Sequence, residues 1–222
     1  MGTIKNLYET SVDLTPVFIE PHSLAIRIWH WTLFVFLTAS LVTVLLASTV
    51  FRTRNTIGLV QQNLQDKGLV VSQDQARAVA HAYSDKLWDL HTVLGYVLAG
   101  LLVCRIVIEI TQPGEEKLRS RLKRAAGLST RKDAQHYRLV KWGYILFYGL
   151  IGIMALTGLG LAFESVPVLK EWHRVIKQLH AFVQYFIYGF IVIHLVGVIR
   201  ADTGKHKGVV SGMIHGRGEV SA

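Results

Sequence analysis

The sequence predicts an all-α membrane protein, a bundle of four transmembrane helices. Half of its 222 residues (51%) are hydrophobic, which is too apolar for an ordinary soluble domain. Four apolar stretches, at residues 24–51, 87–110, 139–163 and 180–200, are each long enough to cross a bilayer as a helix. Four such helices form one membrane domain, predicted here at residues 24–200.

The segments outside this domain are polar. Residues 1–23 form a predicted N-terminal lead-in, and residues 201–222 form a predicted basic tail. The first apolar stretch is unlike a signal peptide, because a long polar segment precedes it and its apolar run is too long. We therefore expect this stretch to be retained as a membrane helix.

The charge distribution predicts the orientation of the helices. Fifteen Lys and Arg residues lie in the N-terminal segment, the segment between the second and third stretches and the tail, counted as residues 1–27, 111–141 and 200–222, whereas the other two loops carry 8. The positive-inside rule then places both termini and the middle loop in the cytoplasm. The net charge of +9 is thus explained by membrane topology, and we expect no binding to nucleic acid.

The two loops on the outer side contain helical patterns. Ser72 and Gln75 match a capping box, and apolar residues at helical spacing follow up to Leu87. A second stripe runs from Leu169 to Leu179. Both patterns predict short amphipathic interfacial helices that lead into the next span. They serve either as membrane anchors or as docking sites for an extracytoplasmic partner.

Four histidines lie near the ends of the apolar stretches: His30, His91, His180 and His194. His180 and His194 are fourteen residues apart in one continuous apolar segment. On a helix that spacing is about 21 Å along the axis, and the two side chains point within ~40° of each other. Imidazoles in lipid are costly unless something binds them. Two haem irons, one near each membrane face, would bind them.

The antiparallel order of the spans sorts these histidines into two pairs by depth. His30 pairs with His194 near the cytoplasm, and His91 pairs with His180 near the outer face. Two six-coordinate haems with bis-histidine ligation need this arrangement, whereas zinc or copper would need three or four clustered ligands. The chain has one cysteine and no C-x-x-C-H motif, so any haem is non-covalent and b-type. His173 and His81 are rival ligands for the outer site.

Two arginines are candidate partners for haem propionates. Arg105 follows His91 by fourteen residues, which places it at the level of the inner haem; it binds a propionate or forms an ion pair with Glu109 one turn on. Arg27 lies one turn before His30, and either contacts a propionate or extends to lipid phosphate. The glycines of the third stretch favour close helix packing or leave room for a flat macrocycle.

Three features make the chain similar to the prokaryotic cytochrome b561 superfamily. They are SLAIRIWHWTLFVFLTAS in the first span, KLWDLHTVLGYVLAGLLVCRIV in the second, and the spacing of His180 and His194. Within the superfamily, the chain most resembles the b-type cytochrome subunits of membrane-bound nickel–iron hydrogenases and of the related thiosulfate reductases and formate dehydrogenases. The first span departs from the family pattern in reading VLLAST at its outer end.

This resemblance implies a role in electron transfer. It implies two b haems, one on His30 and His194 and the other on His91 and His180, in the bacterial inner membrane. It also implies electron passage between an extracytoplasmic, hydrogenase-like redox subunit and the quinone pool. A pocket beside the inner haem, near Arg27 and the basic tail, is the candidate quinone site.

Three other functions stay open. The first is a stand-alone quinone reductase or superoxide oxidase of the same superfamily. The second is a ferric or ascorbate-linked reductase of the eukaryotic b561 type, which the helix count and histidine placement disfavour. The third is a haem-free membrane transporter or assembly protein with structural histidines.

Overall fold

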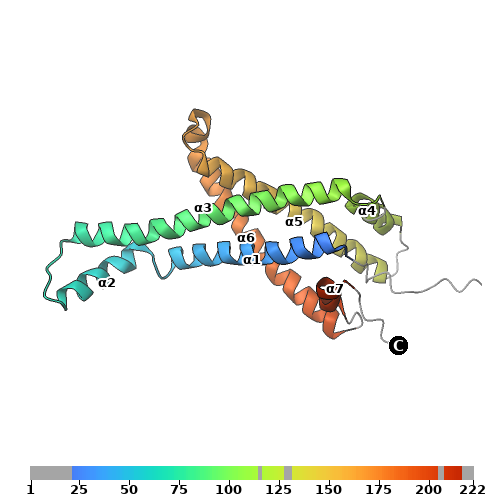
Figure 1. Cartoon of the computed structure of the whole chain (residues 1–222), viewed down its shortest axis with the longest axis horizontal. Coiled ribbons are helices and arrows are strands. Elements are labelled where there is room, and N and C mark those ends of the chain that lie inside the picture. The colour runs from blue at the N-terminus through green and yellow to red at the C-terminus, as the bar shows by residue number, and fades with distance from the viewer. Residues whose placement is uncertain (1–21, 115–116, 128–131, 205–207, 217–222) are drawn as a thin grey trace, which may run out of the picture.

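The computed structural model describes residues 22–114, 117–127, 132–204 and 208–216, which form seven α-helices (Figure 1). Four of these helices are long, namely α1 (Leu24–Ser48), α3 (Gln73–Thr111), α5 (Lys132–Ala162) and α6 (Pro167–Thr203). Nearly all of the predicted lead-in, residues 1–23, lies outside the described residues, as does part of the predicted tail.

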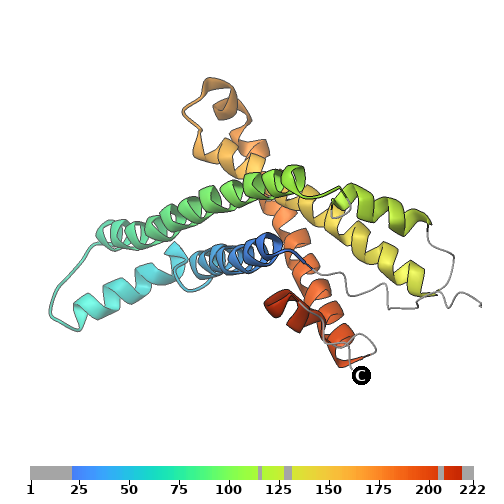
Figure 2. The same ribbon diagram turned by 45° about the vertical axis from the view of Figure 1, so that its right-hand side comes forward.

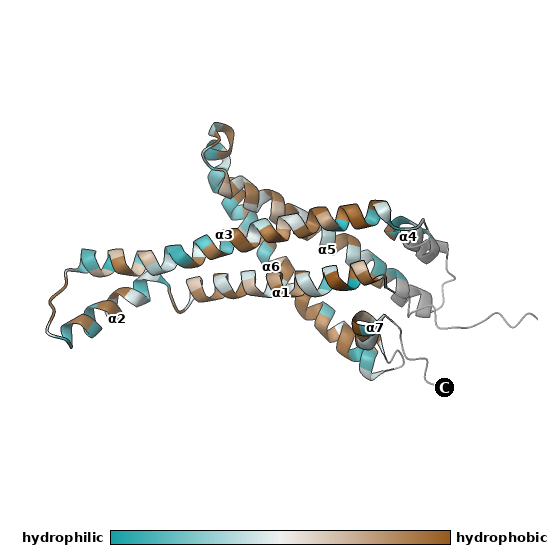
Figure 3. Cartoon of the chain, viewed as in Figure 1, coloured by the Kyte–Doolittle hydropathy of each residue, from teal (hydrophilic) through white to brown (hydrophobic). Residues whose placement is uncertain are grey.

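The four predicted spans are confirmed as the four long helices. Each contains a window that is long and apolar enough to cross a membrane. In α3 the apolar residues are concentrated in the part nearer α4, whereas the opposite end is largely hydrophilic (Figure 3). The described chain is therefore an all-α membrane protein with four transmembrane helices.

The long helices form two antiparallel hairpins. Helix α1 packs along α3, and α5 packs along α6. The two hairpins cross each other at a steep angle, which both ribbon views display (Figures 1 and 2). Contacts between α3 and α5 join the hairpins. A crossing of this kind brings the middle parts of different helices together while their ends diverge.

Helix α1 meets α3 through a regular stripe. Its buried residues recur every three to seven positions, as Trp29, Leu33, Ser40, Thr43 and Ala47, which is the spacing of one helical face. The indole nitrogen of Trp29 donates a hydrogen bond to the carbonyl oxygen of Leu101 on α3, at 2.7 Å. This bond fixes the depth of α1 against α3.

Helix α3 extends well beyond the membrane. Its 39 residues span about 58 Å at the helical rise, against a hydrocarbon core of about 30 Å. The predicted capping box begins it: Gln75 N donates to Ser72 Oγ at 3.2 Å, and Ser72 N donates to Gln75 Oε1 at 2.9 Å. The amphipathic stretch after Ser72 therefore runs into the second span, as predicted, but it is part of one continuous helix and not a separate short helix. The stripe after Pro167 is likewise continuous with the fourth span, within α6.

The sequence did not reveal three shorter helices. Helix α2 (Thr53–Gln65) packs against the extended part of α3, and α4 (Leu118–Gly127) packs against α5. Helix α7 (Val209–His215) lies between two glycines, Gly208 and Gly216, whose positive φ angles of 92° and 82° favour glycine.

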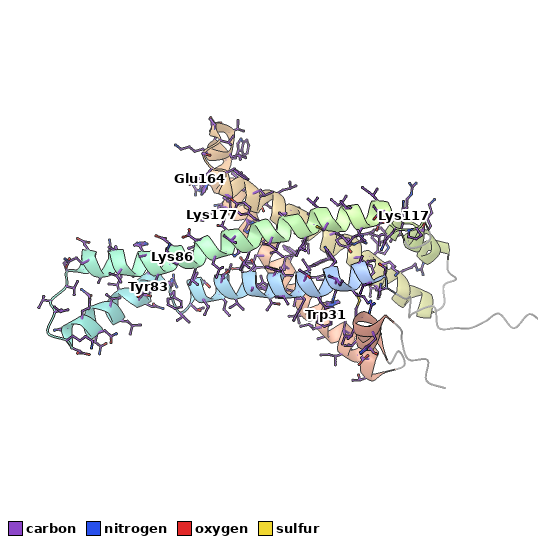
Figure 4. The ribbon with its side chains drawn as sticks, viewed as in Figure 1. Trp31, Tyr83, Lys86, Lys117, Glu164 and Lys177 are labelled. Atoms are coloured by element: carbon purple, nitrogen blue, oxygen red, sulfur yellow. The ribbon has the colours of Figure 1, made fainter. Side chains whose placement is uncertain are left out.

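Helix α7 folds back against the start of α1. Arg27 Nη1 donates to the Ile214 carbonyl at 2.7 Å, and Trp31 Nε1 donates to the Met213 carbonyl at 3.2 Å (Figure 4). Part of the predicted tail is therefore an ordered helix that is attached to the first span.

Candidate functional site

The structure brings the four predicted histidines together in the two predicted pairs. The inner pair consists of His30 on α1 and His194 on α6, whose ring centroids are 6.3 Å apart. The outer pair consists of His91 on α3 and His180 on α6, whose ring centroids are 6.4 Å apart. Helix α6 thus contributes one imidazole to each pair, as the fourteen-residue spacing predicts.

The spacing within each pair fits a metal ion held between two imidazoles. A bond between a metal ion and an imidazole nitrogen is about 2.0–2.1 Å long, so two imidazoles on opposite sides of one metal have ring centroids roughly 6.4 Å apart. Among the described residues there is no cluster of three or more His, Cys, Asp or Glu that could hold a metal ion. The described chain therefore offers two-ligand sites, and these suit haem iron, whose other four ligands come from the porphyrin.

The outer pair is surrounded by hydroxyl groups. His91 Nδ1 lies 3.1 Å from Thr43 Oγ1 and 3.2 Å from Ser40 Oγ. His180 Nδ1 lies 2.9 Å from Thr157 Oγ1. Since the Nδ1 atoms are engaged on the protein side, Nε2 is the nitrogen of each ring that remains for a ligand.

A cavity of 440 Å³ lies at the outer pair, within the range of about 300–1,000 Å³ that cofactor pockets occupy. All four long helices line it, and both His91 and His180 face it. His173 and Lys177 also line it, and Lys177 lies at the same end of the α5–α6 hairpin as Glu164 (Figure 4). His173 and Lys177 thus supply nitrogen donors at the outer end of the cavity.

The rival outer histidines differ from the outer pair in their contacts. His173 Nδ1 lies 3.2 Å from Glu164 Oε2, and His81 is exposed. Neither ring faces a second imidazole in the described structure.

Gly158 allows α5 to approach the outer pair closely. A Cβ atom added at this glycine would lie 3.3 Å from His180 Cε1, which is tighter than ordinary van der Waals contact. Two of the other glycines of the third span, Gly149 and Gly152, have nothing within 4 Å of such an atom. Close packing therefore explains Gly158, but the space beside the other two is open.

The inner pair is surrounded by aromatic rings. His194 stacks on Phe190, with centroids 6.0 Å apart and ring planes 7° apart. His30 meets the edge of the Trp31 ring at 5.5 Å. The Nδ1 atom of His30 is buried and has no hydrogen-bond partner in the described part of the chain.

Arg105 lies at the level of the inner pair, as predicted, since its guanidinium carbon is 6.0 Å from the ring of Trp29, the neighbour of His30. The arginine is buried. Its Nε donates to the Tyr148 hydroxyl at 2.9 Å, and its Nη2 donates to Glu109 Oε2 at 3.0 Å. Its Nη1 is buried and has no partner among the described residues. The ion pair with Glu109 is therefore present, and one donor remains for another acceptor.

Arg27 lies at the junction of α1 and α7. One of its terminal nitrogens is bonded to the Ile214 carbonyl, and its Nε is buried without a partner in the described chain. The contact with α7 could not be predicted from the sequence, because it is made to a backbone carbonyl of a short helix that polar residues flank.

The hydroxyl groups that contact the outer pair were also not predicted from the sequence; they belong to Ser40, Thr43 and Thr157. The available signal was weak: each is a hydroxyl residue inside an apolar stretch. Its orientation toward a histidine depends on helix rotation, which hydropathy does not determine.

Comparison with known proteins identifies the family of the chain. A family model described as prokaryotic cytochrome b561 matches residues 21–216. No curated protein and no solved structure matches the chain. The family match covers all four spans, both histidine pairs and helix α7.

Proposed function

The chain belongs to the prokaryotic cytochrome b561 family, so it is a multi-pass bacterial membrane protein and a b-type cytochrome of membrane electron transfer. From this premise we propose that it holds two b haems and carries electrons between an extracytoplasmic redox partner and the quinone pool. The spacing within the two histidine pairs supports this proposal most directly. Family membership argues against a haem-free transporter or assembly protein.

In this proposal each histidine pair would hold one haem iron. A haem bound there would supply one-electron redox chemistry. The protein orients the ligands, excludes water and neutralises the propionates. We assign Arg105 Nη1 and Arg27 to the inner propionates, and His173 and Lys177 to the outer ones.

The absorption spectrum and haem content of the purified protein test this proposal. We expect a b-type spectrum that sharpens on reduction, and about two haems per chain by pyridine haemochrome assay against protein concentration. A content of one haem would remove one pair from the proposal, and a haem-free protein would refute it.

Gly158 tests the outer site specifically. A Gly158→Val substitution is expected to displace the imidazole of His180, because even a Cβ atom lies 3.3 Å from that ring. We expect the haem content to fall from two to about one per chain. Gly152→Val is the matched control, since nothing lies within 4 Å of a Cβ at that site of the same helix. Equal haem loss in both variants would point to general damage to α5.

An extracytoplasmic partner is supported by the extended part of α3. This part and α2 project from the end of the α1–α3 hairpin (Figures 1 and 2), and we place them outside the bacterial inner membrane, with both termini in the cytoplasm, from the charge bias. Leu59, Leu69 and Val70 are exposed there. A stand-alone quinone reductase or superoxide oxidase needs no such extension. Purification in mild detergent distinguishes the two, since a conduit should retain a redox subunit that is lost when Leu59, Leu69 and Val70 are replaced by serine.

The proposed quinone site lies beside the inner pair, near Arg27 and α7. The contact of Arg27 with the Ile214 carbonyl brings the tail close to the start of α1. We expect Arg27→Leu to slow quinone reduction in a stopped-flow assay by more than any accompanying loss of the inner haem, which the absorption spectrum of the same sample measures. Unchanged rates would place the quinone elsewhere.

A further inference from the structure

The two histidine pairs differ in what lies behind their imidazole rings. At the outer pair, the Nδ1 atoms of His91 and His180 both contact threonine hydroxyls, at 3.1 Å and 2.9 Å. At the inner pair, Nδ1 of His30 is buried without a hydrogen-bond partner in the described chain, and His194 stacks on the apolar ring of Phe190. One protein thus holds two similar ligand pairs in two different polar environments.

The hydroxyl protons determine the direction of these hydrogen bonds. Thr157 Oγ1 lies 2.7 Å from the Ile153 carbonyl, and Thr43 Oγ1 lies 2.6 Å from the Ser40 carbonyl. A hydroxyl has one proton and carbonyl oxygens only accept, so each threonine donates to the carbonyl of its own helix. Its oxygen must then accept from the histidine, which places the imidazole proton on Nδ1.

This assignment leaves Nε2 of His91 and of His180 unprotonated, which is the form that binds metal. A histidine that donates its other N–H to an acceptor is held in one tautomer and one ring orientation, and it is a more basic ligand. A more basic axial ligand stabilises the ferric state of haem, which lowers the reduction potential.

We propose that Thr43 and Thr157 are positioning residues for the outer haem, and that they lower its reduction potential relative to the inner haem. The proposal rests on the two-haem function given above. In this inference Thr43 on α1 acts through His91 on α3, and Thr157 on α5 acts through His180 on α6. A lower potential at the outer haem also favours electron transfer from the outer haem to the inner haem, which lies near the proposed quinone site.

The test is a spectroelectrochemical titration of single variants. Thr157→Val keeps the side-chain shape but removes the acceptor, whereas Thr157→Ser keeps the acceptor. We expect Thr157→Val to retain two haems and to shift the ferric–ferrous equilibrium of one haem about tenfold toward the reduced form, which is ~59 mV for a one-electron couple. Thr157→Ser should restore the original value. Thr43→Val should shift the same haem in the same direction but by less, because the hydroxyl and carbonyl oxygens of Ser40 lie 3.2 Å and 3.3 Å from His91 Nδ1 and still accept from it.

Thr92→Val is the matched control. Thr92 lines the same cavity, but its hydroxyl donates to the Trp88 carbonyl of its own helix at 3.0 Å, so we expect both potentials to stay unchanged. The shifted haem is assigned to the outer site by repeating Thr157→Val in a His30→Ala background, which lacks the inner ligand pair.

The outcomes separate this inference from the proposed function. Two bound haems with unchanged potentials in Thr157→Val, or equal shifts of both haems, would overturn the inference but leave the conduit intact. The same holds if serine fails to restore the potential. If Thr157→Val loses the outer haem, the reduction potential of the outer haem in Thr43→Val is the test: a higher potential supports the inference, and an unchanged potential overturns it. A wild-type protein without haem would instead refute the proposed function itself.

Discussion

Alanine substitution of either histidine of a pair is expected to remove the one haem that this pair binds. His30→Ala and His194→Ala should each remove the inner haem, and His91→Ala and His180→Ala should each remove the outer haem. Each single variant is then left with about one haem per chain, because an apolar cavity holds a b haem chiefly through its axial ligands. Haem content and reduced-minus-oxidised spectra measure this directly, and the two members of a pair should give the same residual spectrum.

The shared helix provides a stronger version of the experiment. Helix α6 carries His180 and His194, whereas α1 and α3 each carry one histidine of a pair. The double variant His180→Ala/His194→Ala should therefore lose both haems, while His30→Ala/His194→Ala should lose only the inner one. His81→Ala is the control and should retain both haems, since His81 is exposed. If His180→Ala kept both and His173→Ala lost one, the outer ligand assignment would be wrong.

The spans and the pairing of the histidines could be predicted from the sequence, since both depend on local geometry. The rise and periodicity of a helix place His180 and His194 on one face and at opposite membrane surfaces. The alternation of helix direction then determines which histidine of another span reaches the same depth. Neither step requires knowledge of how the helices are rotated or how steeply they cross.

The groups around the histidines could not be predicted in this way. Whether Thr43 or Thr157 faces an imidazole depends on the rotation of α1 and α5, and many residues share a similar depth. The steep crossing of the hairpins likewise depends on side-chain packing between distant parts of the chain. Helix α2 was missed because TRNTIGLVQQNLQ contains few apolar residues and packs on a part of α3 that lies outside the apolar span.

Replacement of Arg105 is expected to weaken the inner haem and to leave the outer haem in place. Arg105 is buried beside Trp29, and its Nη1 has no partner in the described chain. A buried guanidinium donor without an acceptor is unfavourable, and a propionate would supply that acceptor by a charge-assisted hydrogen bond. Arg105→Met keeps the apolar stem but removes the donors. We expect inner haem affinity to fall about 10–100-fold, the usual effect of removing an outer-shell partner, as measured by haem titration of the apoprotein.

Two further variants separate a propionate contact from the ion pair with Glu109. Glu109→Gln removes the negative charge, but Arg105 retains its bond to the Tyr148 hydroxyl and its free Nη1, so inner haem affinity should change little. Arg105→Lys keeps the positive charge but replaces the planar guanidinium group by a single ammonium group. Its affinity for the inner haem should therefore lie between those of the wild type and Arg105→Met. Equal losses in Glu109→Gln and Arg105→Met would mean that the ion pair orders the inner site, and the propionate assignment would then be wrong.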